Sequence, residues 1–290
     1  MNGGALVCSI CGAPTEPAGV KASAGRTYHL RRCAECGFAC VADPDTLADP
    51  YDDAYYRGKG ADPLVDYLFD TDHPERTIRQ LEWRGTFGVI ESIKRVGNGT
   101  RWLDYGCGTG GFVRWLSRRG VAACGYDQGR GAALARERGI AVLDDAQLDA
   151  AAPFDVITAI EVLEHLVDPQ PVVDRIARLL TPGGVFFYTT GNASRHAGAL
   201  ASWSYVVPEI HVAFFEPRTM ARMLRASGLQ TVEPRWSRGF SDIVAYKILK
   251  NLRVHRNTSP LAALPWQWVT RAVDRGAGVS AFPVGVRPEA

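Results

Sequence analysis

The stretch that decides the fold lies in the middle of the chain and is rich in glycine: Leu103-Asp104-Tyr105-Gly106-Cys107-Gly108-Thr109-Gly110-Gly111. The apolar pattern predicts a short strand over residues 101–105 and a helix over residues 110–119. Glycines between a strand and a helix allow a sharp turn and a close approach of the backbone to a ligand. The first turn of the helix offers unpaired N–H groups. We therefore predict a ligand-binding loop between the two elements.

Strands and helices alternate on the C-terminal side of this loop. Further strands are predicted at residues 121–126, 140–143, 154–160 and 185–190. The strand at 154–160 is apolar on both faces, as a buried parallel strand should be. On the N-terminal side, a helix is predicted over residues 74–96, with Pro74 in its first turn. The alternation predicts an α/β fold with a parallel sheet.

The composition is that of an ordinary globular protein. The chain has 290 residues, 46% of them hydrophobic and 22% charged, which excludes a disordered chain, a fibrous repeat and a coiled coil. No apolar run is long enough to span a bilayer, and the first seven residues do not resemble a signal peptide. We therefore expect a cytoplasmic protein without a membrane partner. The net charge of +2 argues against a nucleic-acid partner.

Two Cys-x-x-Cys motifs stand near the N-terminus. They are formed by Cys8 with Cys11 and by Cys33 with Cys36. Each motif lets two thiolates converge on one ion, and two motifs complete a tetrahedron around a structural zinc. A redox-active pair is the main alternative. The nearby Cys40 is a spare thiol, and His29 is a substitute ligand or an ordinary surface histidine.

Two acids define the ligand of the glycine-rich loop. Asp104 precedes the first glycine, where a carboxylate suits a cationic amino group better than a pyrophosphate. Asp127 ends the second predicted strand, where a carboxylate can accept hydrogen bonds from both hydroxyls of a ribose. The expected ligand has a ribose and a positively charged amino-acid part. S-adenosylmethionine fits this description.

These motifs resemble those of the class I S-adenosylmethionine-dependent methyltransferases. The first motif of that family is matched by Asp104, Gly106, Gly108 and Gly110, and the acid of its second strand by Asp127. The resemblance covers roughly residues 74–250. It implies a doubly wound, Rossmann-like sheet that is mostly parallel with an antiparallel last strand. It also implies that three further residues contact the cofactor: Asp145, for which the adjacent Asp144 is the alternative, Ala146 and Glu161.

The whole layout is similar to a narrower bacterial group, small-molecule and sugar methyltransferases with an N-terminal zinc-binding segment. The resemblance implies a substrate pocket lined by Tyr56, Tyr67, His165 and Phe214, with a structural role in the loop after the fourth strand as the alternative for His165. It also implies a role for His211 as the general base, because an imidazole titrates near neutrality. The alternative for His211 is a buried histidine that hydrogen-bonds a loop. The group carries a glutamate before this histidine, and Ile210 replaces it here.

The expected organisation is a zinc-binding segment at 1–42, a tyrosine-rich lid and helical linker at 43–98, and the methyltransferase domain at 99–290. The tyrosines of the lid either pack as a core or touch the substrate. The basic run at 247–256 is expected to form a solvated helix face.

The expected function is methylation of an oxygen, nitrogen or carbon atom of a small-molecule acceptor, with S-adenosylhomocysteine as the product. A sugar or a natural-product intermediate is a candidate acceptor. The alternatives are a ribosomal-RNA methyltransferase, a non-catalytic cofactor-binding scaffold and a nicotinamide oxidoreductase. Either a monomer or a homodimer is expected.

Overall fold

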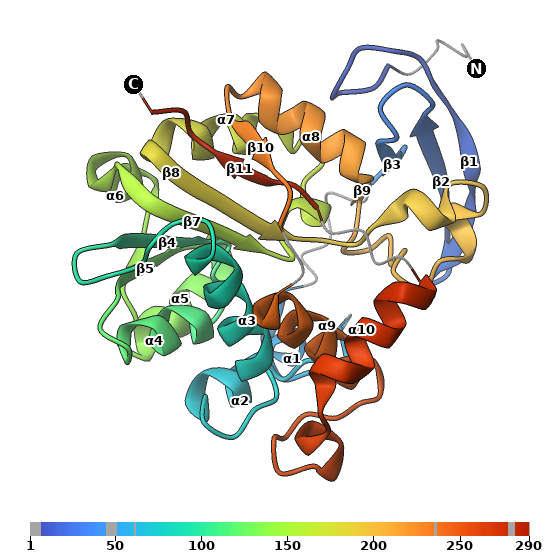
Figure 1. The fold of residues 1–290 in the computed structure, drawn as a ribbon. Helices are drawn as coiled ribbons and strands as arrows, with labels where there is room; N and C mark the ends of the chain where they lie inside the picture. Colours follow the sequence, from blue (N-terminus) through green and yellow to red (C-terminus); the bar gives the residue numbers. More distant parts are fainter. Residues whose placement is uncertain (1–6, 45–50, 61, 235–236, 278–281, 290) are drawn as a thin grey trace.

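The computed structural model describes residues 7–44, 51–60, 62–234, 237–277 and 282–289, and it contains two sheets with helices packed around them (Figure 1). The larger sheet has the strand order β10-β11-β8-β7-β4-β5-β6. Its strands are β4 (Arg101–Tyr105), β5 (Ala122–Tyr126), β6 (Val142–Leu143), β7 (Phe154–Ile160), β8 (Leu180–Thr189), β10 (Gln230–Val232) and β11 (Val284–Val286). Strands β4 to β8 are parallel, and β11 inserts antiparallel between β8 and β10. The predicted fold class is thereby confirmed.

Helices cover both faces of this sheet, as Figure 1 shows. They are α3 (Gln80–Glu91), α4 (Gly111–Ser117), α5 (Gly129–Glu137), α6 (Asp145–Ala151), α7 (Gln170–Leu179), α8 (Pro217–Ala226) and α9 (Arg238–Asn251). The core on one face joins α3, α4 and α9 to the sheet, and the core on the other face joins α6, α7 and α8 to it. Val156 and Ile157 of β7 point into opposite cores and are both fully buried, which explains why this strand has no polar face.

The helix predicted over residues 74–96 is shorter in the structure, where α3 begins at Gln80 and a separate helix, α2 (Tyr67–Asp72), precedes it. The Thr77 hydroxyl donates to Asp70 at 2.6 Å and accepts from the Arg79 N–H at 3.0 Å. A side chain that satisfies nearby polar groups in this way competes with the helical pattern of hydrogen bonds. The predicted start at Pro74 was therefore wrong.

A four-stranded antiparallel sheet packs against one end of the main sheet. It has the order β1-β2-β3-β9, with β1 (Thr15–Ser23), β2 (Arg26–Cys33), β3 (Ala39–Val41) and β9 (Ala213–Phe214). Three strands come from the N-terminal segment, whereas β9 comes from the region that follows the fifth parallel strand. The pairs Ala39 with Phe214 and Cys40 with Ala213 join the two parts of the chain.

The remaining elements are short or belong to the C-terminal region. They are α1 (Asp53–Tyr56), α10 (Trp266–Ala277) and the 3₁₀ turns η1 (Leu163–His165), η2 (Ala193–His196), η3 (Leu200–Ser202) and η4 (Pro260–Ala263). Helices α3 and α9 approach closely at Gly85 and Gly239, where a Cβ on Gly85 would lie 2.5 Å from the Gly239 carbonyl oxygen. Within the described part of the chain, no helix has the length and apolar character needed to cross a bilayer.

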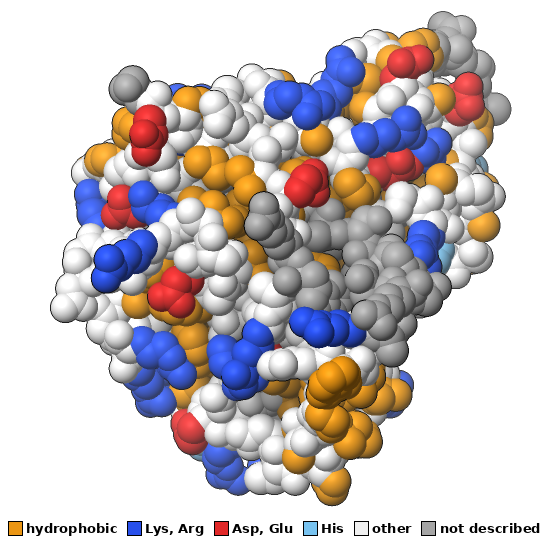
Figure 2. Space-filling view, in the orientation of Figure 1, with side chains coloured by type: hydrophobic (Ala, Val, Ile, Leu, Met, Phe, Trp, Pro, Cys, Tyr) orange, Lys and Arg blue, Asp and Glu red, His pale blue; other side chains and the backbone are white. Residues whose placement is uncertain are grey.

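The surface mixes charges of both signs. In the view of Figure 2, basic side chains lie among acidic ones, and hydrophobic side chains gather near α10. The prediction that residues 247–256 form a solvated helix face was wrong for Lys247. Its ammonium forms ion pairs with Glu82 at 2.9 Å and Glu161 at 3.0 Å.

Candidate functional site

A cavity of about 540 Å³ lies where β4, β5 and β7 end. Its walls are the glycine-rich loop, the residues that follow β5 and β7, and the tyrosines of the predicted lid. The carboxyl ends of parallel strands are the usual place for a ligand in an open α/β sheet. The fold therefore brings the two motif acids and the lid, which are far apart in the sequence, to one place.

The glycine-rich loop needs its glycines for both conformation and space. Gly106 has φ +75°, and a Cβ there would lie 2.4 Å from a methyl group of Val162. Gly110 has φ +78° where it caps α4, and a Cβ there would lie 2.8 Å from Ile140. Gly106 and Gly108 line the cavity, whereas Gly110 is not among its lining residues. Gly110 therefore fixes the shape of the loop through its contact with Ile140 and does not contact the cavity.

Asp104 is a buried carboxylate in the cavity wall. It is only 5% exposed, and its Oδ1 accepts a hydrogen bond from the Thr158 hydroxyl at 2.8 Å. Burial raises the pKa of Asp104 to about 7, although the Thr158 hydrogen bond opposes this rise. A cationic ligand beside Asp104 would restore the ionised form.

Asp127 lies on the other side of the glycine-rich loop. Its Oδ2 accepts a hydrogen bond from the Gly108 N–H at 2.7 Å, and its side chain lines the cavity. Burial raises the pKa of Asp127 to about 6, with the backbone N–H groups of Gly108 and Gln128 opposing the shift. The hydrogen bond from Gly108 therefore holds Asp127 against the glycine-rich loop without the help of a ligand.

The lid tyrosines both pack on one another and face the cavity. Tyr55 stacks on Tyr67 with ring centroids 5.4 Å apart and meets Tyr56 edge-on at 5.2 Å. Tyr56 is 6% exposed, and both Tyr56 and Tyr67 line the cavity. The two roles considered from the sequence, core packing and substrate contact, are therefore compatible.

Two histidines lie side by side beyond β7. His165 lines the cavity, and the ring of His211 lies 5.0 Å from the ring of His165 and 4.3 Å from that of Tyr205. His211 Nδ1 lies 2.7 Å from the Tyr205 carbonyl oxygen, and His165 Nδ1 lies 2.7 Å from the Ile210 carbonyl oxygen. A carbonyl only accepts, so Nδ1 carries the proton in both rings and each Nε2 keeps a lone pair.

Burial keeps both imidazoles neutral. It lowers the pKa of His165 to about 4, and the neighbouring His211 also disfavours a charge on this ring. Burial also lowers the pKa of His211. Each ring is therefore available as a proton acceptor at neutral pH.

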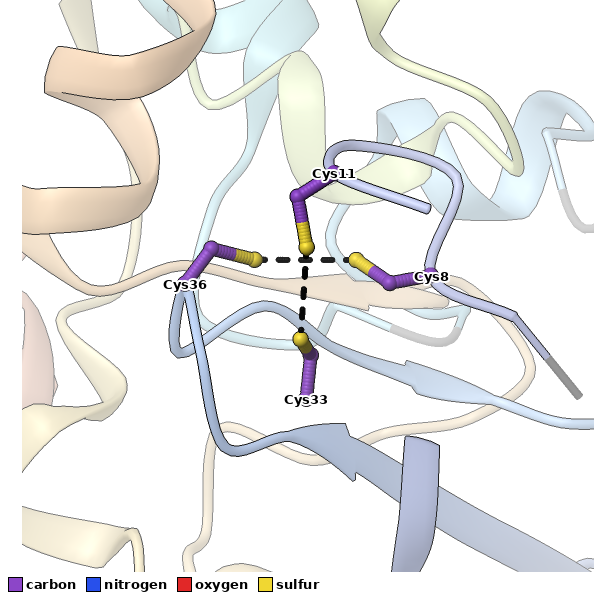
Figure 3. A group of neighbouring side chains, drawn as sticks. All are labelled: Cys8, Cys11, Cys33 and Cys36. Carbon is purple, nitrogen blue, oxygen red and sulfur yellow. Dashed lines mark hydrogen bonds between the residues drawn. The ribbon is translucent and has the colours of Figure 1, made fainter. Parts of the chain in front are cut away.

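The four predicted zinc ligands converge in the N-terminal segment. Figure 3 shows the side chains of Cys8, Cys11, Cys33 and Cys36 pointing toward one another. The Sγ atoms of Cys8 and Cys36 lie 3.6 Å apart, and those of Cys11 and Cys33 lie 3.5 Å apart. Four sulfurs around zinc at a Zn–S distance of about 2.3 Å lie roughly 3.8 Å apart in a regular tetrahedron. The spacing of the thiols fits such an ion.

Comparison with known proteins identifies the family. A model described as a methyltransferase domain matches residues 56–233, which include both motif acids and all residues lining the cavity except Tyr51 and Tyr55. This chain belongs to that family of methyltransferase domains.

This methyltransferase is similar to curated relatives and to solved structures. The ubiquinone biosynthesis O-methyltransferase of Xylella fastidiosa (strain M23) is 34% identical over 156 residues, which are 47% of this chain and 63% of the relative. The protein of the same name from Xanthomonas axonopodis pv. citri (strain 306) is 33% identical over 190 residues, 58% of this chain and 77% of the relative. A phosphoethanolamine N-methyltransferase of Haemonchus contortus, solved with S-adenosyl-L-methionine, has a TM-score of 0.48 and 13% identity, and the match covers 94% of this chain and 71% of that one. That likeness is too low to support a functional argument.

Several expected site residues lie elsewhere in the methyltransferase domain. Asp145 and Ala146 are not among the residues lining the cavity, and the Asp145 carboxylate binds Arg175 at 2.6 Å and the Tyr126 hydroxyl at 2.8 Å. Phe214 does not line the cavity either. It is 1% exposed in the core beneath the N-terminal sheet, because its strand pairs with β3.

Arg79 is a cavity residue of the methyltransferase domain that sequence reasoning missed. It lines the cavity, and its guanidinium lies 5.0 Å from the centroid of the Tyr67 ring. Its Nε lies 3.2 Å from Oε2 of Glu82, and Nη1 lies 3.7 Å from Oδ2 of Asp70. In the predicted helix over 74–96 this arginine was an ordinary helical residue, and no motif marked it.

Proposed function

We propose that this protein transfers a methyl group from S-adenosylmethionine to an oxygen of a small-molecule acceptor. One observation carries the proposal: the glycine-rich loop, Asp104 and Asp127 all line one cavity. This pairing suits a ligand with a cationic amino group at one end and a ribose at the other. The family to which the chain belongs supports the same chemistry.

The charges of the cavity fit the cofactor. Its wall carries the acidic side chains of Asp104, Asp127 and Glu161, together with the cation Arg79. The ammonium of the cofactor would lie near Asp104, its ribose hydroxyls near Asp127, and its carboxylate within reach of Arg79. S-adenosylhomocysteine lacks the sulfonium charge, so this acidic wall favours the cofactor over the product.

The acceptor is expected to carry a hydroxyl group. The matched relatives are named as O-methyltransferases, which supports an oxygen acceptor. The cavity wall includes Tyr51, Tyr55, Tyr56 and Tyr67, which suit a flat, partly apolar molecule. The acceptor would lie beside these tyrosines and His165, the histidine that lines the cavity.

In the proposed mechanism, the chain orients two reactants and removes one proton. S-adenosylmethionine supplies a methyl group on a sulfonium, whose sulfur keeps the bonding electron pair when the acceptor oxygen takes the methyl. His211 Nε2 accepts the hydroxyl proton and later releases it to water, while the Tyr205 carbonyl fixes the tautomer. The tyrosines and the glycine-rich loop hold the reactants in line and exclude water.

Calorimetric titration with S-adenosylmethionine, followed by transfer of a labelled methyl group to a panel of phenols, catechols and sugars, tests the proposal. Saturable cofactor binding and a labelled acceptor would support it. A protein that is folded but does not bind the cofactor would refute it.

Cofactor affinity is expected to rise with pH. Burial places the pKa of Asp104 at about 7 and that of Asp127 at about 6, and the ammonium beside Asp104 and the ribose hydroxyls that donate to Asp127 would lower both pKa values. The complex then holds fewer protons than the free protein, so affinity increases between about pH 5.5 and 8. Calorimetry across this range, in buffers with different ionisation enthalpies, should show tighter binding and proton release. An affinity that does not change with pH would contradict this prediction.

We also propose that the four thiolates hold one structural zinc ion. All four ligand positions come from the protein, so such a site is closed to substrate. Two contacts join the second Cys-x-x-Cys motif to the start of α8. The Thr219 hydroxyl donates to the Cys36 carbonyl at 2.7 Å, and Arg32 forms an ion pair with Glu216.

Cys33→Ala is expected to abolish stoichiometric zinc and to lower the melting temperature, because metal binding is coupled to folding. Elemental analysis and thermal melting measure both effects, and Cys40→Ala serves as the control because Cys40 lies outside the thiol cluster. Wild-type protein purified without stoichiometric metal would refute the zinc site.

A further inference from the structure

Lys247 reaches from α9 to the wall of the cavity, although no motif contains it. Its ammonium lies 2.9 Å from Oε1 of Glu82 and 3.0 Å from Oε1 of Glu161, and its side chain is 30% exposed. The close contact of α3 and α9 at Gly85 and Gly239 makes this reach possible. A partly buried lysine between two carboxylates therefore lies beside the proposed reaction site.

Glu82 does not depend on Lys247 for a counter-charge. This glutamate is fully buried, and its Oε2 already faces Arg79 at 3.2 Å. Glu161 has a different environment: among the residues that the structure describes, Lys247 is its single ion-pair partner. The ammonium is therefore needed more by Glu161 than by Glu82.

Glu161 is held in an unusual conformation at the end of β7. Its φ is +54°, in a region that residues with a side chain seldom adopt, and it lines the cavity. Its Oε1 accepts a hydrogen bond from the Thr189 hydroxyl at 3.0 Å. A strained backbone persists where surrounding contacts fix it, and the ion pair with Lys247 is one of these contacts.

Tyr205 connects Glu161 to the histidines. The Tyr205 hydroxyl lies 3.3 Å from Oε2 of Glu161 and also contacts Oε1 of the buried Glu164. The Tyr205 carbonyl accepts from His211 Nδ1, and the two rings stack at 4.3 Å. A change in the position of Glu161 would therefore pass through Tyr205 to the ring of His211.

The pKa values of Glu161 and Glu164 are shifted in opposite directions. Burial, together with the negative charge of Glu161, raises the pKa of Glu164 to about 8. Burial would also raise the pKa of Glu161, but the positive charges of Lys247 and, to a smaller extent, Lys250 lower it well below its ordinary value. The charged or titratable groups that face the two glutamates are Lys247 and Lys250 of α9, Glu82 of α3, Tyr205, His165 and His211.

We propose that Lys247 is a positioning residue for the methyl transfer: its ammonium fixes the Glu161 carboxylate at the cavity wall, and that carboxylate holds Tyr205 and, through Tyr205, the ring of His211. The inference rests on the proposed function, in which His211 accepts the acceptor proton. It goes beyond that function because Lys247 touches neither reactant.

The first test uses the cofactor-free protein and does not need the acceptor. In wild-type protein, proton NMR should detect a slowly exchanging His211 Nδ1–H, because that proton is donated to a buried carbonyl. Lys247→Met should speed its exchange by about tenfold or more, since a loosened ring opens to water more often. Lys247→Arg should preserve the signal. Lys94→Met is the matched control, because Lys94 is 27% exposed and pairs with Asp155 instead.

The second test separates positioning from charge balance. Lys247→Met should lower kcat by about 10²-fold through misplacement of the base, while the cofactor Kd stays within a few-fold of wild type. The acid limb of the kcat profile should move to higher pH, because Glu161 then protonates more easily. In Lys247→Met/Glu82→Gln, which restores the net charge of the cluster, the histidine signal and kcat should stay impaired, because Glu161 still lacks its ion pair with Lys247.

Recovery of both the histidine signal and kcat in the double variant would overturn the inference, because Lys247 would then only neutralise Glu82. An unchanged histidine signal in Lys247→Met would overturn it as well. Failure of wild-type protein to bind S-adenosylmethionine would refute the proposed function, and the NMR experiment would still decide whether Lys247 positions His211.

Discussion

His211→Ala is expected to lower kcat by about 10²–10⁴-fold, the usual contribution of a general base, with cofactor affinity near the wild-type value. The reason is the neutral ring with its free Nε2, which burial and the Tyr205 carbonyl together maintain. Because burial lowers the pKa of His211, wild-type activity should fall only at a pH below the ordinary imidazole range. Steady-state kinetics across pH, with circular dichroism to confirm folding, measure this effect.

His255→Ala is the control for this variant, because His255 is an exposed histidine away from the cavity wall. His165 is the alternative base, because it lines the cavity and its Nε2 is also unprotonated. If His211→Ala kept turnover within a few-fold of wild type while His165→Ala lost it, the base would be His165. The structure makes this comparison necessary, because His211 lies behind His165 rather than among the lining residues.

Asp127→Ala is expected to weaken S-adenosylmethionine binding by roughly ten-fold to over a hundred-fold. Loss of hydrogen bonds to a charged group costs about 1.5–3 kcal/mol, and each 1.4 kcal/mol is a factor of about ten in Kd. The carboxylate also holds the Gly108 N–H at 2.7 Å, so the loop itself would loosen. Titration calorimetry of the variant gives the change in Kd directly.

Two further variants isolate the ribose contact. Asp127→Asn keeps an oxygen that can accept from the Gly108 N–H, so a similar loss of affinity in this variant would point to the ribose and not to the loop. Asp149→Ala is the control, because Asp149 is exposed on α6 and pairs with Arg175. An unchanged Kd in Asp127→Ala would remove Asp127 from the cofactor site.

The parts of the fold that local pattern determines were predictable. The bounds of β4 and β7 agree with the predicted strands, because each is a compact apolar run limited by polar or glycine residues. The start of α3 at Gln80 was not predictable. The contacts of Thr77 with Asp70 and Arg79 interrupt the predicted helix, and hydrophobic periodicity carries no information on such contacts.

The site divides in the same way. Asp104, Gly106, Gly108 and Asp127 follow strand ends at short range, and all four line the cavity, as a sequence pattern can foresee. Lys247 finds its partners only through helix packing, since Glu82 lies 165 positions earlier in the chain. Nothing local to Lys247 distinguishes it from the other basic residues of its helix. Residues whose partners are distant in sequence can be identified only from the folded structure.

The strand pairing between β3 and β9 has a consequence for any attempt to shorten the protein. Removing the first 44 residues would leave the backbone N–H and C=O groups of β9 unpaired at a sheet edge, where they could recruit another chain. Phe214, now covered by the N-terminal sheet, would become an exposed aromatic side chain on that edge. We therefore expect the N-terminal segment to protect the larger part of the molecule from aggregation.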